Sequence, residues 1–253
     1  MSAERLEVRS QDGVLHLTLN RPDKRNAMDR IMVDALLEAL AHADLSAEVR
    51  VVALRGAGSD FSAGADLAEL LESVDLPAQQ NAASAARLGQ VFLAMRKLPK
   101  PLVAVVHGRA VAGGLGLATA CDLVLAREDA SFGYPEVQRG FVPAMVIAML
   151  RRAVGEKVAF DLVATGRMLT AQEALAVGLI SRVLPADHFE TEVARFLSEL
   201  AALSPTALAL TKQQLYAADG LAFEAAIELG ARVNAVARST PDFRSAVERF
   251  LKR

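Results

Sequence analysis

The sequence predicts a mixed α/β fold that is followed by a helical C-terminal region. Short apolar runs alternate with helical patterns between residues 49 and 126, which is typical of βα units with largely parallel strands. Hydrophobic residues make up 53% of the 253 residues and aromatic residues only 5%, so we expect a large aliphatic core that is rich in alanine. After residue 187 the pattern is helical and contains no strand.

Composition excludes several classes of protein. The 28 basic and 30 acidic residues give a net charge of −2, which argues against a dedicated nucleic-acid-binding protein. The single cysteine, Cys121, excludes an internal disulfide framework and a cysteine-based zinc site. The charged first nine residues do not resemble a signal peptide, and the most apolar stretch, 101–126, is interrupted by charged residues as in a buried core. We therefore expect a cytoplasmic protein with no metal and no membrane span.

The first 43 residues predict a hairpin and a helix. Alternating apolar residues over 6–19, with Asp12-Gly13 between them, are typical of two antiparallel strands joined by a tight turn. Asn26 is the predicted N-cap of a helix that runs to about residue 43, with Asp29 in the capping-box position.

The middle of the chain predicts alternating strands and helices. Strand patterns cover 49–55, 102–106 and 122–126, and helical patterns cover 87–97 and 112–120. The polar segment 76–86 contains Pro77, so a mobile segment is expected there.

Helical patterns dominate the rest of the chain. They cover 143–154, 156–165 and 171–177, and a short strand pattern follows at 181–184. Three amphipathic helices are expected after residue 187. We expect residues 1–190 to form the core and residues 191–253 to form a helical region that covers this core and packs against another subunit.

Two glycine-rich segments, 61–67 and 107–114, each lie between an apolar strand and a helix. Small residues let a ligand approach the backbone, and the start of a helix presents unpaired N–H groups. Two such donors that converge on one oxygen would form an oxyanion hole. Ordinary tight turns with close helix packing are the alternative interpretation. Neither segment matches a dinucleotide-binding fingerprint or a P-loop.

Glu136 is the acidic residue with the most distinctive surroundings. It follows a small-residue turn and has apolar neighbours at Val137, Phe141 and Val142. Burial among such residues would disfavour the ionised carboxylate, which suits an acid/base catalyst near neutral pH. The alternative is a solvated loop glutamate. No histidine or cysteine has the spacing of a catalytic triad or a metal site.

Six segments, taken in order, resemble the crotonase superfamily, which is also called the enoyl-CoA hydratase/isomerase family. The segments are 17–27, 61–67, 107–122, 132–143, 165–179 and 242–251, so the resemblance covers nearly the whole chain. It implies a crotonase-like spiral of ββα units with a C-terminal helical trimerisation region. It also implies a homotrimer, or a hexamer made of two trimers.

The resemblance further implies an acyl-CoA site. The backbone N–H groups of Ala65 and Gly113 would bind the thioester carbonyl, and Glu136 would be the acid/base residue. The residues implied or proposed for substrate binding are Lys24, Arg25, Ala27, Ala63, Asp66, Leu67, Arg109, Tyr134, Phe250 and Arg253. Arg109 or Tyr134 would hold water or a polar acyl group, and Phe250 and Arg253 would reach the CoA of a neighbouring subunit. Coenzyme A arrives as part of the substrate, so no separate cofactor is expected.

Gly116 departs from the family pattern. Hydratases with two glutamates have one at this position and the other at the position of Glu136. A single base suffices to move a double bond, so the departure favours an isomerase and permits a decarboxylase. The sequence 139–144 resembles a branch described as hydratases that also has glycine here. We therefore expect hydration of a 2-enoyl-CoA, with Δ3-Δ2-enoyl-CoA isomerisation as the main alternative.

Two non-enzymatic functions complete the alternatives. A protein that binds acyl-CoA without catalysis would explain the missing glutamate, but the presence of Glu136 argues against it. RNA binding occurs in one branch of the family through a basic helix near the N-terminus. The corresponding helix here, 26–43, has Arg30 as its one lysine or arginine against three acidic residues, so nucleic acid is not an expected partner.

Overall fold

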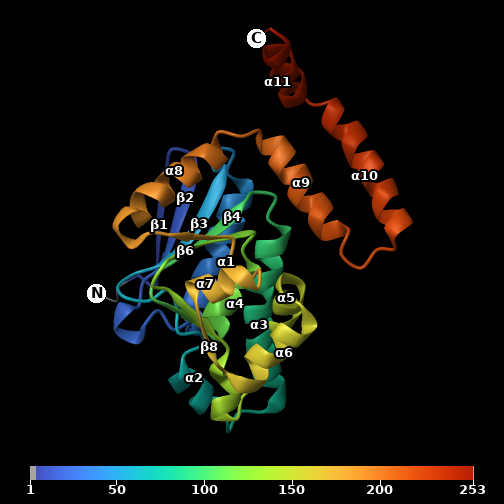
Figure 1. The fold of residues 1–253 in the computed structure, drawn as a ribbon. Helices are drawn as coiled ribbons and strands as arrows, with labels where there is room; N and C mark the ends of the chain where they lie inside the picture. The colour runs from blue at the N-terminus through green and yellow to red at the C-terminus, as the bar shows by residue number, and fades with distance from the viewer. Residues whose placement is uncertain (1–3, 253) are drawn as a thin grey trace.

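The computed structural model describes residues 4–252, which form two sheets surrounded by helices (Figure 1). The larger sheet has the strand order β1-β2-β3-β4-β6-β9 and the smaller one has the order β5-β7-β8. The strands are β1 (Leu6–Gln11), β2 (Val14–Leu19), β3 (Val51–Gly56), β4 (Leu102–Val106), β5 (Arg109–Val111), β6 (Leu123–Arg127), β7 (Ser131–Gly133), β8 (Met168–Thr170) and β9 (Arg182–Leu184).

The helices occupy most of the sequence between the strands. They are α1 (Arg30–Leu45), α2 (Leu67–Glu72), α3 (Ala78–Lys97), α4 (Gly113–Ala120), α5 (Ile147–Ala153), α6 (Glu156–Thr165), α7 (Ala171–Ala176), α8 (Phe189–Ala201), α9 (Pro205–Ala217), α10 (Phe223–Arg238) and α11 (Pro241–Leu251). Short 3₁₀ helices lie at Pro22–Lys24, Pro135–Arg139 and Ala186–His188.

The predicted N-terminal hairpin is confirmed. β1 and β2 are antiparallel, and Gln11 pairs with Val14 across the turn. Asp12 and Gly13 both have positive φ angles, 50° and 79°, as a two-residue type I′ turn requires. From β2 to β9 the larger sheet is parallel, as the alternation of strands and helices predicts.

The central strands of the larger sheet bury side chains on both faces. Val52 and Leu54 join the main core, which includes side chains from α1, α3 and α4, whereas Val51 and Ala53 pack with α8 on the other face. This two-sided burial explains why β3 is a continuous apolar run in the sequence.

The predicted start of the first long helix is wrong by three residues. Asp29 is the N-cap of α1, and its side chain accepts a hydrogen bond from the N–H of Met32. Asn26 instead has a positive φ angle of 55°, and its amide nitrogen donates to the carbonyl oxygens of Ala57 and Asp60. Asn26 therefore connects two loops and does not cap the helix.

The predicted start of the next helix at residue 87 is also wrong, because α3 is one continuous helix from Ala78 and includes most of the segment 76–86. Pro77 is the N-cap residue, a place where a missing N–H breaks no intrahelical hydrogen bond. The alanine-rich sequence that follows has high helix propensity.

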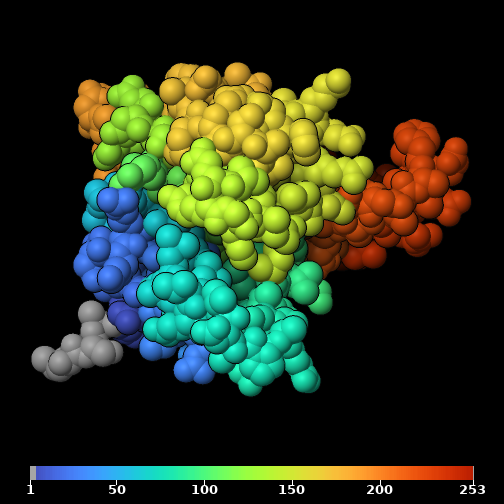
Figure 2. All heavy atoms as spheres, turned by 90° about the horizontal axis from the view of Figure 1, so that it is seen from below, coloured from blue at the N-terminus to red at the C-terminus, as the bar shows by residue number. Residues whose placement is uncertain are grey.

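Residues 189–252 of the described chain contain four helices, whereas three were predicted. α8 packs on the sheet through Phe189, Val193 and Leu197, so position 190, the expected boundary of the core, lies within a helix of the sheet layer. Residues 205–252, which we call the C-terminal arm, comprise α9, α10 and α11. The arm extends away from the body in Figure 1 and forms a protrusion in Figure 2.

No single helix within residues 4–252 is long and apolar enough to cross a membrane. By length and composition alone, the bent pair Ala186–Ala201 and Pro205–Ala217 passes the same test when taken together.

Candidate active site

The two glycine-rich segments meet at the start of α4. A Cβ atom added to Gly64 would lie 2.9 Å from the Cβ of Ala112 and 3.0 Å from the backbone nitrogen of Gly113. A Cβ added to Gly113 would lie 3.7 Å from the backbone nitrogen of Ala65. The N–H groups of Ala65 and Gly113 therefore flank the same small space. The close approach of the two backbones requires glycine at position 64, where φ is +92°.

Backbone pairing fixes the direction of the Ala65 N–H. The N–H of Met28 donates to the carbonyl oxygen of Gly64 at 2.7 Å, and the N–H of Asp66 donates to that of Met28 at 2.9 Å. The Gly64 carbonyl and the Ala65 N–H belong to one planar trans peptide group and point in opposite directions. The Ala65 N–H therefore points away from Met28, and it donates to no backbone carbonyl among the described residues.

The start of α4 fixes the Gly113 N–H in the same way. The carbonyl oxygen of Ala112 accepts a hydrogen bond from the N–H of Gly116 at 2.9 Å, so the Gly113 N–H points out of the helix N-terminus. Ala112 has φ 51° and ψ −132°, a conformation that is strained for a residue with a Cβ. Its own N–H donates to the carbonyl oxygen of Gly133 at 2.9 Å, which helps to hold the turn.

Glu136 follows this anchored segment. It lies in the 3₁₀ helix Pro135–Arg139, three residues after Gly133, and is only 9% exposed. Burial raises the pKa of its carboxyl group above the usual value, and Oε2 has no hydrogen-bond partner in residues 4–252. Of the two environments considered for Glu136, the structure supports the buried one, although Val137, Phe141 and Val142, which were expected to bury it, are themselves exposed. An unpaired, partly desolvated carboxylate is suited to exchange a proton with a ligand.

The space next to Gly116 is filled by apolar side chains. A Cβ added there would lie 2.4 Å from Cγ1 of Val146 and 3.4 Å from Cζ of Phe92. A glutamate at this position would therefore require Val146 to move. In this structure Glu136 has no carboxylate partner from position 116.

The segments predicted to contact coenzyme A lie side by side. The N–H of Ala63 donates to the carbonyl oxygen of Arg25 at 2.9 Å, next to the pairing of Met28 with Ala65. The side chains of Lys24, Arg25 and Leu67 are exposed, and Ala27 is buried. These residues form an accessible edge beside the two N–H donors.

Two other predicted residues are engaged elsewhere. Arg109 pairs with Asp60 through two hydrogen bonds, at 2.8 and 3.1 Å, and the hydrogen bond from Arg109 lowers the pKa of Asp60. Arg109 begins β5, whereas the Gly113 turn follows the end of this strand. Tyr134 is fully buried, which raises the pKa of its hydroxyl, and that hydroxyl lies 3.0 Å from the hydroxyl of Thr119 on α4. Arg109 is thus held by Asp60 through Nε and Nη2, and the Tyr134 hydroxyl is paired with Thr119.

The helix that carries Phe250 lies far from these donors along the fold. Phe250 belongs to α11 in the C-terminal arm, is 75% exposed and does not reach α4 of its own chain (Figure 1). Arg253 lies outside the described residues.

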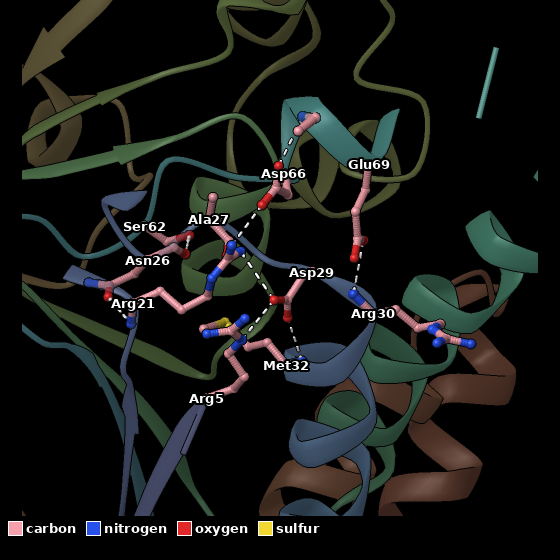
Figure 3. Close-up of polar contacts among 11 residues, drawn as sticks. Arg5, Arg21, Asn26, Ala27, Asp29, Arg30, Met32, Ser62, Asp66 and Glu69 are labelled. Carbon is pink, nitrogen blue, oxygen red and sulfur yellow. Dashed lines mark hydrogen bonds and ion pairs between the residues drawn. The ribbon is translucent and has the colours of Figure 1, made fainter. Parts of the chain in front are cut away.

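A buried charged cluster beside the site was missed by sequence reasoning (Figure 3). Arg21 is 8% exposed and contacts Asp66 at 2.8 Å and Asp29 at 3.4 Å, and Arg5 contacts Asp29 at 2.8 Å. Burial opposes ionisation of Asp66, but hydrogen bonds from Arg21 and from the N–H of Ala68 outweigh it and lower the pKa of Asp66. No sequence pattern indicates that Arg21 pairs with a residue 45 positions later.

The two fixed N–H donors can stabilise a negative oxygen, and the buried carboxylate of Glu136, on the 3₁₀ helix that follows β7, can exchange a proton. Residues 9–253 match the family model described as Enoyl-CoA hydratase/isomerase. The chain belongs to this family, and its crotonase-like α/β fold confirms the predicted fold class.

Named relatives include both hydratases and isomerases. A Thermus thermophilus protein, to which the name enoyl-CoA hydratase is given provisionally, is 44% identical over 93% of each chain. The 2,3-dehydroadipyl-CoA hydratase of Escherichia coli is 35% identical, over 98% of this chain and 96% of its own. The human mitochondrial Delta(3,5)-Delta(2,4)-dienoyl-CoA isomerase is 34% identical, over 85% of this chain and 69% of its own.

A solved structure supports the same fold. The crystal structure of an enoyl-CoA hydratase from Mycobacterium smegmatis superposes with a TM-score of 0.94 at 32% identity, over 98% of this chain and 96% of that one.

Proposed function

We propose that this protein hydrates a 2-enoyl-CoA, with Glu136 as its acid/base residue. This proposal rests on the pair of N–H groups of Ala65 and Gly113, which face one space. The direction of each N–H is fixed because the carbonyl in the same peptide group accepts a hydrogen bond. Such a pair suits the thioester oxygen, which becomes negative when the enolate forms.

In the proposed reaction, the oxygen of a water molecule bonds to Cβ while Glu136 accepts a proton from that water. The electrons of the double bond move toward the thioester oxygen, where the two N–H groups stabilise the enolate. The enolate then collapses as Cα takes the proton from Glu136, so the carboxylate is regenerated. The raised pKa of Glu136 suits both halves of this cycle.

The main alternative is Δ3-Δ2-enoyl-CoA isomerisation, in which Glu136 takes a proton from one carbon and returns it to another. The space beside Gly116 favours this alternative, because Val146 fills it and a second carboxylate would have no room there. Isomerases among the relatives are consistent with it. A protein that binds acyl-CoA without catalysis remains the third candidate.

Ultraviolet absorbance of the conjugated thioester distinguishes these functions. Purified protein is mixed with a short-chain 2-enoyl-CoA and, separately, with the 3-enoyl-CoA isomer. A fall with the 2-enoyl substrate supports hydration, whereas a rise with the 3-enoyl substrate and no fall with the other supports isomerisation. In the Glu136→Gln variant the rate of either absorbance change should fall by several orders of magnitude, while the affinity for acyl-CoA stays near normal. Binding without any absorbance change would contradict both enzymatic proposals.

We further propose that the C-terminal arm assembles the protein as a trimer or hexamer. The arm exposes large apolar side chains that its own chain leaves uncovered. They include Leu215, Phe223, Ile227, Val236 and Phe250. Sedimentation of the full chain would test this, because a 26.9 kDa species at micromolar concentration would contradict it.

A further inference from the structure

Arg21 is connected to the Ala65 N–H by a chain of hydrogen bonds through two peptide groups. Nη1 of Arg21 donates to the carbonyl oxygen of Ala27 at 2.7 Å. The N–H of Met28, in the same peptide group, donates to the carbonyl oxygen of Gly64 at 2.7 Å. The Gly64 carbonyl shares its peptide group with the Ala65 N–H. This series of hydrogen bonds begins at the Arg21 guanidinium, which Figure 3 shows beside Asp29 and Asp66, and ends at a backbone donor of the candidate active site.

A hydrogen bond to a peptide oxygen withdraws electron density and makes the N–H of that peptide a stronger donor. This strengthening amounts to roughly 10–30% per bond in condensed-phase estimates, and it is greatest where water is excluded. Ala27, Met28 and Gly64 are buried, so the chain passes through a dry environment. Bonds from a charged donor such as Arg21 are also stronger than those from a neutral one.

We propose that Arg21 is a positioning residue that orients and polarises the Ala65 N–H through the peptide groups of Met28 and Ala65. The inference rests on the proposed function, in which this N–H binds the thioester oxygen. Arg21 itself does not touch the substrate.

The cluster is poorly explained by stability alone. Buried ion pairs contribute little net stability, because desolvation offsets their attraction. The Arg21 guanidinium is held by Asp66 at 2.8 Å, and Asp66 is also the N-cap of α2 immediately after Ala65. Asp29 and Asp66 therefore hold the Arg21 guanidinium so that its Nη1 donates to the Ala27 carbonyl, the first hydrogen bond of the series that leads to the Ala65 N–H.

Infrared spectroscopy of a bound thioester tests the proposal. The probe is butyryl-CoA with a ¹³C-labelled thioester carbonyl, which has no double bond to hydrate. In the wild-type protein we expect the carbonyl frequency to fall relative to free butyryl-CoA. In Arg21→Met a measurable part of that fall should be lost, kcat for the enoyl substrate should drop up to about 10-fold, and KM should change less than about two-fold.

Arg5→Met is the matched control. Arg5 contacts Asp29 in the same cluster, but the hydrogen bonds to the Ala27 and Gly64 carbonyls come from other residues. The control variant should keep the wild-type carbonyl frequency. Equal effects of Arg5→Met and Arg21→Met would overturn the proposal, since loss of any cluster charge would then suffice. A folded Arg21→Met variant with the wild-type frequency and kcat would overturn it as well.

If circular dichroism shows that Arg21→Met does not fold, Arg21→Lys decides. A lysine keeps the charge but cannot contact Ala27, Asp29 and Asp66 together as the planar guanidinium does. We expect a partial loss of the frequency shift, and full retention would overturn the proposal. A wild-type protein that binds butyryl-CoA without any shift would instead refute the proposed oxyanion hole, so the two failures are distinguishable.

Discussion

The ammonium group of Lys212, on α9, lies 2.8 Å from the carboxylate of Asp122, although 90 positions separate them in the chain. Lys212 is 7% exposed and also donates to the carbonyl oxygens of Met95 and Lys100, each at 3.1 Å. The other oxygen of Asp122 accepts a hydrogen bond from Tyr216. This contact anchors the C-terminal arm to the body of the fold.

Lys212→Met should destabilise the protein by about 3–5 kcal/mol, because it leaves the carboxylate of Asp122 without its cation in a largely buried place. Urea unfolding measures this loss. Lys157→Met is the control, because Lys157 is exposed and should change the free energy of unfolding by less than about 0.5 kcal/mol. Similar values for the two variants would show that the anchor contributes nothing.

Glu136→Gln should make the protein more stable at pH 7, although inactive. Burial raises the folded-state pKa of Glu136 above its unfolded value. Below the unfolded value both states are protonated and no penalty exists. As pH rises toward the folded pKa, the unfolded chain loses its proton first, so the folded state loses relative stability, and above that pKa the penalty is constant.

The advantage of Glu136→Gln should therefore disappear below about pH 4, close to the ordinary glutamate pKa. Thermal unfolding across the pH range measures it. Glu38→Gln, at an exposed position on α1, is the comparison. An equal and pH-independent effect of both substitutions would contradict burial as the cause.

Gly113→Ala and Gly114→Ala should separate activity from stability. The new methyl group at 113 would lie 3.2 Å from the flexible Cε of Met28 and 3.7 Å from the backbone nitrogen of Ala65, in front of the Ala65 N–H. Turnover should fall about 10²-fold, as when one oxyanion donor is lost, with little change in melting temperature. At 114 the methyl group would lie 2.4 Å from the backbone oxygen of Ser62, so Gly114→Ala should lower the free energy of unfolding by about 1–3 kcal/mol. If Gly113→Ala instead lost stability and kept its activity, the thioester oxygen would not bind between the N–H groups of Ala65 and Gly113.

Gly116→Glu should destabilise the protein by about 1–3 kcal/mol, because its Cβ would lie 2.4 Å from Cγ1 of Val146. Combining it with Val146→Ala should recover much of this loss, since the substitution removes the clashing atom. Chemical denaturation of both single variants and the double variant measures the coupling. If the double variant is no more stable than Gly116→Glu, Val146 is not the obstacle. Once folded, the double variant should hydrate a 2-enoyl-CoA faster than Val146→Ala does.

The sequence alone determined the parts of the fold that depend on local patterns. The hairpin follows from alternating residues around Asp12-Gly13, and the parallel sheet follows from apolar runs such as Val51–Gly56. Likewise, the glycine-rich segments indicated where backbone N–H groups would be left without partners. The burial of Glu136 was not determined by its sequence neighbours, because Val137, Phe141 and Val142 are themselves exposed.

Tertiary structure decided what distant residues do to one another. Asn26 does not cap α1, because the carbonyls of Ala57 and Asp60 engage its side chain. The space next to Gly116 is filled only because the chain returns there with Val146. The Ala65 N–H has a defined direction only because Met28 pairs with Gly64, and Arg21 reaches that pairing through Ala27. Propensity and periodicity report on neighbours in sequence, whereas hydrogen-bond geometry and steric exclusion act between groups that only the folded chain brings together.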